Sequence, residues 1–186
     1  MTGGLTRMEN RMQKTDENVI LIGFMGSGKS SVGKKLAGLL AVPCLDTDAL
    51  IEEQEKMTIR EIFAQRGQEY FRDAETRAVR GLTDRAGRYV LSVGGGLPLR
   101  AENREILKKL GMVIYLKASV QTLAERLARD TTRPLLQGEK PLEEKITRIL
   151  SEREVLYEEA CSHVVLSDGK SVREVAQEIR RLIETL

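Results

Sequence analysis

Short apolar runs alternate along this chain with longer stretches in which apolar residues recur at helical spacing. Runs of four or five apolar residues are typical of strands buried on both faces of a parallel sheet, and stretches with helical spacing are typical of the helices that cover it. The predicted strands are residues 19–23, 42–45, 89–93, 112–116 and 163–166. The alternation therefore predicts an α/β fold in which helices flank a parallel sheet.

Capping and turn signals divide the remaining residues into helices and loops. Thr58 with Glu61 and Ser171 with Glu174 each match a capping box, in which two side chains satisfy the first backbone N–H groups of a helix. Gly67 is expected to interrupt a helix, and the polar residues 129–141 are expected to form a loop. The predicted helices are 31–40, 49–55, 58–66, 69–85, 100–110, 119–128, 142–159 and 171–186, the last with Val172, Val175, Ala176, Ile179, Ile183 and Leu186 on its apolar face.

Between the first predicted strand and the helix after it, residues 23–30 read Gly-Phe-Met-Gly-Ser-Gly-Lys-Ser and match the phosphate-binding pattern G-x-x-x-x-G-K-[ST]. Glycines let the backbone turn tightly, so that its N–H groups approach phosphate oxygens at the positive end of the helix dipole. Lys29 is expected to reach the β- and γ-phosphates, and the Ser30 hydroxyl is expected to bind Mg²⁺. This stretch predicts that the protein binds a nucleoside triphosphate.

Two further segments follow the next two predicted strands: Asp46-Thr-Asp48 after the second and Gly94-Gly95-Gly96 after the third. Ligands of parallel sheets bind beyond the carboxyl ends of the strands, so both segments are expected to meet the phosphate loop. One aspartate suits Mg²⁺ and the other suits a hydrogen bond from the hydroxyl that attacks the γ-phosphate, although Asp is also a common helix cap. The glycines either bring backbone amides against a small ligand or form an ordinary turn.

The composition is that of an ordinary globular protein with one domain. Of 186 residues, 41% are hydrophobic and 31% are charged, and 30 basic against 28 acidic residues leave a net charge of +2. This balance disfavours nucleic acid or a membrane surface as a partner, and no apolar run reaches the length of a membrane span. Two cysteines without metal-ligand spacing fit reduced thiols in the cytoplasm. Residues 1–18 lack an apolar core, so we expect a flexible leader, not a signal peptide, before a single domain of residues 19–186.

Together these motifs resemble the shikimate kinase family. The resemblance rests on the phosphate loop, Asp46-Thr-Asp48 and the three glycines, and also on Phe71-Arg72 with Glu75, Arg133-Pro-Leu-Leu136, and Arg153 with Tyr157. It implies a three-layer P-loop kinase fold with a five-stranded parallel sheet and a mobile lid at about residues 129–141. It also implies ATP-dependent phosphorylation of the 3-hydroxyl of shikimate, with Mg²⁺, in the pathway to chorismate and the aromatic amino acids.

The same resemblance implies roles for individual residues. Asp48 would bind the shikimate hydroxyls, either as a true general base or only by orienting the attacking hydroxyl. Arg72 and Arg153 would hold the carboxylate, and Gly94, Gly95 and Gly96 would lie against the ring. Arginine suits a planar carboxylate because its guanidinium donates two parallel hydrogen bonds, and Glu75, three residues after Arg72, is placed to steer that guanidinium.

The catalytic residues implied in this way are Lys29, Asp48 and Arg133, and the Mg²⁺ site is Ser30 with Asp46. Arg133, on the lid, would reach the phosphates, and Arg126 would lie near the adenine. The expected nucleotide contacts are Gly26, Ser27, Gly28, Lys29, Ser30, Ser31, Arg126 and Arg133.

Three other functions compete with this interpretation. A gluconate kinase of the same fold would need different acceptor residues, and the paired arginines with the glycine triplet count against it. A nucleotide-binding regulatory module without turnover would be expected to have lost some of Lys29, Ser30, Asp46, Asp48 and Arg133. A P-loop ATPase that acts on nucleic acid is disfavoured by the near-neutral charge and the small size. We therefore expect a monomeric cytoplasmic kinase whose partners are shikimate and ATP.

Overall fold

The computed structural model describes residues 17–128, 136 and 140–186, and within this part of the chain five strands form one sheet. The strands are β1 (Asn18–Ile22), β2 (Cys44–Asp46), β3 (Val90–Ser92), β4 (Gly111–Lys117) and β5 (His163–Leu166). They lie in the order β2-β3-β1-β4-β5, and every neighbouring pair is parallel. The predicted α/β fold with a five-stranded parallel sheet is therefore confirmed.

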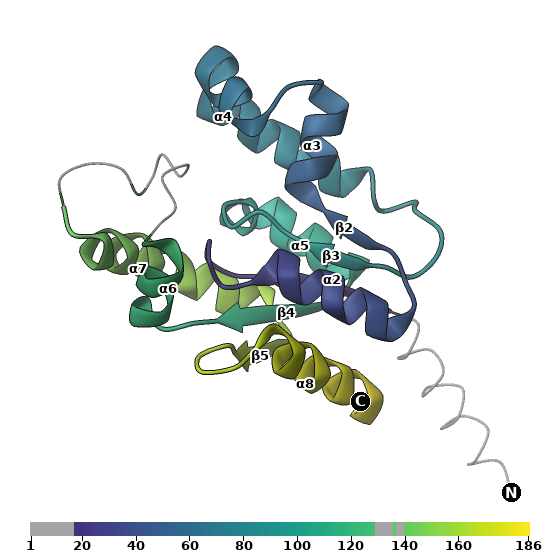
Figure 1. The fold of residues 1–186 in the computed structure, drawn as a ribbon. Coiled ribbons are helices and arrows are strands. Elements are labelled where there is room, and N and C mark those ends of the chain that lie inside the picture. Colours follow the sequence, from purple (N-terminus) through teal and green to yellow (C-terminus); the bar gives the residue numbers. More distant parts are fainter. Residues whose placement is uncertain (1–16, 129–135, 137–139) are drawn as a thin grey trace, which may run out of the picture.

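Helices cover both faces of this sheet (Figure 1). The described helices are α2 (Lys29–Leu40), α3 (Thr47–Glu55), α4 (Ile59–Arg80), α5 (Ala101–Leu110), α6 (Val120–Leu127), α7 (Leu142–Ala160) and α8 (Val172–Thr185), with a short 3₁₀ helix, η1 (Leu97–Leu99). Helices α2 and α8 pack on one face, and α5 and α7 pack on the other, which gives three layers. None of these described helices combines the length and the apolar character that a membrane span requires.

The side chains of β1 show why the strand sequence is continuously apolar. Val19 and Leu21 are buried among residues of α2 and α8, whereas Ile20 and Ile22 are buried among residues of α5 and α7. All four are at most 1% exposed. A strand with helices on both faces needs an apolar side chain at every position, so the run does not alternate with polar residues.

Local signals set most of the element ends as predicted. The capping boxes at Thr58 and Ser171 are both present, and Ser119 caps α6 with its side chain. Gly67 interrupts α4 with φ 81° and ψ 176°, and the helix resumes directly after it. β5 has the predicted bounds, and β1 begins at Asn18, one residue earlier than predicted. Residues 1–16 of the predicted leader and most of the predicted lid lie outside the described residues.

The predictions for the end of α4 and for the apolar face of α8 were wrong in detail. Helix α4 ends at Arg80 and not at residue 85, because residues 81–84 leave the helix in tight turns. Val172 and Leu186 do not belong to the buried face of α8, since they are 41% and 38% exposed. Both stand at the ends of the helix, beyond the central part that covers the sheet.

Candidate active site

The predicted phosphate loop, aspartates and glycines meet at the carboxyl ends of β1, β2 and β3. They border a cavity of about 550 Å³. Its lining also includes residues from α6 and from the start of α8, elements far apart in the sequence. The lining residues are Met25, Gly26, Gly28, Lys29, Ser30, Ser31, Asp46, Asp48, Ser92, Val93, Gly94, Gly95, Arg126, Lys170, Ser171 and Val172. Most of the predicted nucleotide and acceptor residues therefore share one hollow, although Ser27, 1% exposed, is not in its lining.

The phosphate loop has the backbone that its glycines predict. Gly28 stands directly before α2 with φ 97°, a left-handed conformation that favours glycine. The first turn of α2 itself contains no acidic residue, and the cavity lies at the positive end of the helix dipole. Lys29 is 9% exposed, and its ammonium group donates to the carbonyls of Gly23 at 2.9 Å and Phe24 at 2.8 Å. The loop thus holds N–H donors and one cation around a site suited to a polyphosphate.

Asp46 joins the phosphate loop to α3 through its two carboxylate oxygens. Its Oδ1 accepts a hydrogen bond from the Asp48 backbone N–H at 3.0 Å, which caps α3 and makes this helix begin at Thr47 and not at the predicted Ala49. Its Oδ2 accepts a hydrogen bond from the Ser30 hydroxyl at 2.9 Å. The two sequence interpretations of Asp46, helix cap and phosphate-site carboxylate, are therefore compatible, because one side chain provides both contacts.

Ser92 belongs to the same cluster of oxygen atoms, and the sequence analysis missed it. Its hydroxyl lies 3.2 Å from the Ser30 hydroxyl, and it is 2% exposed at the end of β3. The signal was a single polar residue inside an otherwise apolar strand, two residues before the first of the three glycines. Together Ser30, Asp46 and Ser92 present hydroxyl and carboxylate oxygens, the donors that Mg²⁺ prefers.

Each of the three glycines stands next to a different neighbour, and an added Cβ would clash at Gly94 and Gly96 and be tight at Gly95. A Cβ atom on Gly94 would lie 2.7 Å from Oδ1 of Asp48, and one on Gly96 would lie 2.2 Å from Nη1 of Arg72. A Cβ on Gly95 would lie 3.3 Å from the carbonyl oxygen of Gly23 in the phosphate loop. The glycine triplet is thus more than an ordinary turn, because it lets Asp48, Arg72 and the phosphate loop approach one another.

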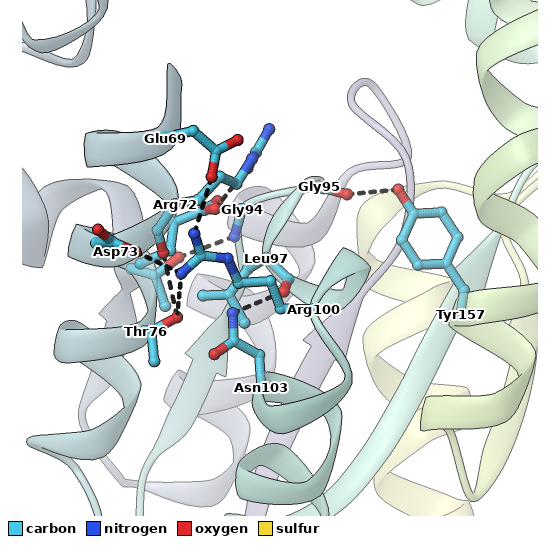
Figure 2. Close-up of polar contacts among 12 residues, drawn as sticks. Glu69, Arg72, Asp73, Thr76, Gly94, Gly95, Leu97, Arg100, Asn103 and Tyr157 are labelled. Atoms are coloured by element: carbon cyan, nitrogen blue, oxygen red, sulfur yellow. Dashed lines mark hydrogen bonds and ion pairs between the residues drawn. The ribbon is translucent and has the colours of Figure 1, made fainter. Parts of the chain in front are cut away.

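Hydrogen bonds hold this glycine turn from two sides. The Gly94 N–H donates to the hydroxyl of Thr47, a buried residue of α3, at 2.8 Å. The Tyr157 hydroxyl, from α7, donates to the Gly95 carbonyl at 2.6 Å (Figure 2). The glycine turn is therefore bonded to α3, the helix that carries Asp48, and to α7, the helix that carries Arg153.

Arg72 and Arg153 come from α4 and α7 and meet around Glu75 and Tyr157; neither lines the cavity itself. Arg72 pairs with Glu75 at 2.5 Å, and the two side chains are 12% and 1% exposed. Arg153, 8% exposed, stands four residues before Tyr157 on α7, close enough for its charge to act on the Tyr157 hydroxyl. Burial raises the pKa of Glu75 to about 7 although Arg72 and Arg153 both act to lower it, and the Asp48 carboxylate adds to the rise. Two guanidinium groups thus stand close together in a buried, carboxylate-containing cluster.

Arg100 fixes α4 against the end of the glycine turn, a contact that the sequence did not reveal. Its guanidinium donates to Asp73 at 2.7 Å, to Glu69 at 3.2 Å and to the Thr76 hydroxyl at 3.4 Å (Figure 2). These acceptors lie on successive turns of α4, on either side of Arg72. Because Arg100 directly follows η1 and the glycines, it sets the position of Arg72 relative to Gly96.

Arg126 links the phosphate loop to the segment after β5. It donates to the carbonyls of Gly26 and Ser27, both at 3.3 Å, and to the carbonyl and hydroxyl of Ser167 at 3.1 and 3.2 Å. It therefore lies on the side of the cavity that the phosphate loop forms. Arg133, the predicted catalytic arginine of the lid, lies outside the described residues.

Comparisons with known proteins agree on one family. A family model described as shikimate kinase matches residues 25–184. A shikimate kinase of Geobacter metallireducens is 46% identical over 167 residues, which are 90% of this chain and 92% of that protein. A solved shikimate kinase from Acinetobacter baumannii in complex with shikimate is 39% identical with a TM-score of 0.86, and the match covers 94% of this chain and 97% of that one.

A gluconokinase structure from Sinorhizobium meliloti 1021 is also similar, with 20% identity and a TM-score of 0.54 over 92% of this chain and 95% of that one. At this identity the likeness concerns the fold alone. The shared fold explains why a gluconate kinase was a reasonable alternative from the sequence.

Proposed function

The chain belongs to the shikimate kinase family, and we propose that it transfers the γ-phosphoryl group of ATP to the 3-hydroxyl of shikimate. The products are shikimate 3-phosphate and ADP, and the reaction serves the pathway to chorismate and the aromatic amino acids. The hydroxyl oxygen forms a bond to the γ-phosphorus and gives up its proton, to Asp48 or to solvent, as the bond between that phosphorus and the bridging oxygen of ADP breaks.

The observation that supports this acceptor best is the pair of largely buried arginines, Arg72 and Arg153, that meet around Glu75 and Tyr157 next to the glycine turn. Shikimate combines a carboxylate with ring hydroxyls, so its site needs cations for one end and hydrogen-bond acceptors for the other. Arg72 and Arg153 converge on one cluster from two helices, and Asp48 approaches the same glycine turn that Arg72 approaches. We propose that both arginines hold the carboxylate and that Asp48 accepts hydrogen bonds from ring hydroxyls, while Gly94, Gly95 and Gly96 lie against the ring.

The nucleotide side of the reaction is assigned to the phosphate loop. We propose that Gly26, Ser27, Gly28, Lys29, Ser30 and Ser31 hold the phosphates, with Arg126 near the adenine. Lys29 would exchange its contacts with loop carbonyls for phosphate oxygens, since an ammonium group binds the anionic acceptor more strongly. Catalysis in this class consists mainly of positioning and electrostatic stabilisation.

Ser30 and Asp46 fit a Mg²⁺ ion because both offer oxygen donors next to the phosphate loop, with the Ser92 hydroxyl alongside. When bound, the ion would neutralise charge on the β- and γ-phosphate oxygens. Ser30 and Asp46 would keep the phosphates in line with the acceptor hydroxyl.

Arg133 is proposed to reach the γ-phosphoryl group from a lid at residues 129–141, within a single domain of residues 19–186 that follows a leader. We also propose that the protein acts as a monomer in the cytoplasm, with shikimate and ATP as its partners and without nucleic acid or membrane. A closing lid would exclude water, which otherwise competes with shikimate as acceptor.

A coupled assay of ADP release from MgATP tests the function directly. Shikimate, gluconate, nucleoside monophosphates and a reaction without acceptor are compared at equal concentration. We expect release that depends on shikimate and is close to background with the other additions. Lys29→Ala should abolish this release, whereas Lys35→Ala, an exposed lysine on the same helix, should not change it.

Other results would assign the protein elsewhere. Release with gluconate alone would move it to the gluconate kinases despite its family. ATP binding without release for any acceptor would indicate a regulatory module and overturn the proposed activity.

A further inference from the structure

Tyr157 is a buried side chain that stands between two parts of the proposed shikimate site. It is 0% exposed on α7, one helical turn after Arg153. Its hydroxyl donates to the Gly95 carbonyl at 2.6 Å (Figure 2), and the Arg153 guanidinium lies close enough for its charge to act on the hydroxyl. A phenol has one proton, so donation to the carbonyl leaves the oxygen lone pairs for the guanidinium of Arg153.

The rest of the Tyr157 side chain is fixed by packing. Its ring lies 5.2 Å from the ring of Tyr115 on β4, tilted by 43°, within the main apolar cluster. Burial raises the pKa of Tyr157 above its ordinary value, so the hydroxyl keeps its proton at neutral pH. The hydroxyl is therefore a fixed donor and acceptor at the end of an immobile ring.

We propose that Tyr157 is a positioning residue that holds the glycine turn and the Arg153 guanidinium at one set distance, so that the ring and the carboxylate of the acceptor are recognised together. The inference rests on the proposed function. On the other side, the Thr47 hydroxyl accepts the Gly94 N–H, so the turn is held between α3 and α7. Without the phenol hydroxyl, the Gly95 carbonyl loses its hydrogen bond, and with it goes the link between the glycine turn and the helix that carries Arg153.

This role predicts a specific kinetic signature. Arg153 and the glycine turn would contact the acceptor before and during phosphoryl transfer alike, and neither lies on the transferring group. Loss of such uniform binding raises KM and leaves kcat unchanged. A general structural defect, by contrast, would reduce the active fraction and lower the apparent kcat for both substrates together.

The test compares Tyr157→Phe with Tyr89→Phe. Both changes remove one buried phenol oxygen, and Tyr89 is 1% exposed next to the first residue of β3, at the opposite end of the strand from the glycines. We expect Tyr157→Phe to raise the KM for shikimate about tenfold, the upper end of what the loss of one neutral hydrogen bond implies, with kcat and the KM for ATP within about twofold. Tyr89→Phe should leave all three constants within about twofold, and thermal unfolding of both variants reports on the fold.

A double-mutant cycle tests whether the hydroxyl acts through Arg153. In an Arg153→Lys background, Tyr157→Phe should raise the KM for shikimate by less than about threefold, because the geometry that it maintains is already lost. A full tenfold effect in that background would show that the Tyr157 hydroxyl does not act through Arg153, and would overturn the inference. An unchanged KM for Tyr157→Phe, in an enzyme that phosphorylates shikimate, would overturn this inference alone and leave the proposed function standing. Absence of shikimate turnover in the unchanged protein would overturn both.

Discussion

Gly96→Ala is expected to disturb the proposed acceptor site without lowering the stability of the fold. The backbone at Gly96 has φ −95° and ψ −14°, a conformation that alanine adopts without strain. The added Cβ, however, would lie 2.2 Å from Nη1, 2.5 Å from Nη2 and 2.6 Å from Cζ of Arg72. The variant should therefore fold, and the strain should fall on the flexible end of one arginine.

The expected size of the effect follows from these distances. An ordinary contact requires about 3.4 Å, so Nη1 must move by at least 3.4 − 2.2 = 1.2 Å. A displacement of about 1 Å is enough to break a bidentate pair with a carboxylate. A hydrogen bond to a charged group contributes roughly 1.5–3 kcal/mol, and 1.4 kcal/mol corresponds to a factor of ten, so the KM for shikimate should rise about 10- to 150-fold.

Steady-state kinetics at saturating MgATP, with shikimate varied, measure this effect. Thermal unfolding of the same preparation should show a midpoint within a few degrees of the unchanged protein. Gly38→Ala is the matched control, because Gly38 lies in α2 with no atom within 4 Å of an added Cβ. That variant should keep its kinetic constants and gain up to about 1 kcal/mol of stability.

Two results would refute the reasoning. If Gly96→Ala keeps the KM for shikimate within twofold while Arg72→Ala raises it, Arg72 does not depend on the space above Gly96. If neither variant changes the KM for shikimate, Arg72 does not bind the acceptor at all.

Three further predictions concern the charged residues of the site. The raised pKa of Glu75, about 7 against an ordinary 4.5, means that the folded state holds the proton more tightly, so this group stabilises the fold fully below pH 4.5 and loses that contribution as the pH rises through 7. The free energy of unfolding in urea should therefore fall between pH 5 and pH 8 in the unchanged protein, and it should fall by less in Glu75→Gln, which has no carboxyl group to titrate at this position. Asp46→Asn should raise the Mg²⁺ concentration needed for half-maximal ADP release at least tenfold, and an unaltered Mg²⁺ dependence would remove Asp46 from the metal site. Arg133→Ala should lower kcat roughly 10³-fold and change the KM for shikimate less than threefold, whereas equal losses in both would contradict its assignment to the phosphoryl group.

Features with a local cause could be predicted from the sequence. The strand β1 could be predicted because both of its faces are buried, which requires a continuous apolar run. The phosphate loop could be predicted because its positive φ angles favour glycine. Capping boxes at Thr58 and Ser171 involve residues three apart, so their geometry is independent of the rest of the chain. The end of α4 at Arg80 was misjudged, because apolar spacing alone does not mark where a helix gives way to turns.

Selection of the proposed acceptor residues needed more than a local sequence pattern. Arg72 and Arg153 are single arginines on helices, and only their combination with other motifs in a family resemblance distinguished them from surface charges. Ser92 looked like part of an apolar strand, and Arg100 looked like the ordinary first residue of a helix. Their contacts join segments separated by at least 20 residues, and nothing in either segment alone specifies the other.

The sequence by itself determined which chemistry was present: a loop for phosphates, carboxylates after β2, glycines after β3 and arginines on two helices. Only the tertiary structure decided how these groups share space. Asp46 both caps α3 and accepts from Ser30, Gly96 leaves room for a guanidinium from α4, and burial raises the pKa of Glu75 to about 7. The physical reason is that close approach, desolvation and shared hydrogen bonds depend on which elements pack together, and packing of distant segments is not written into any one of them.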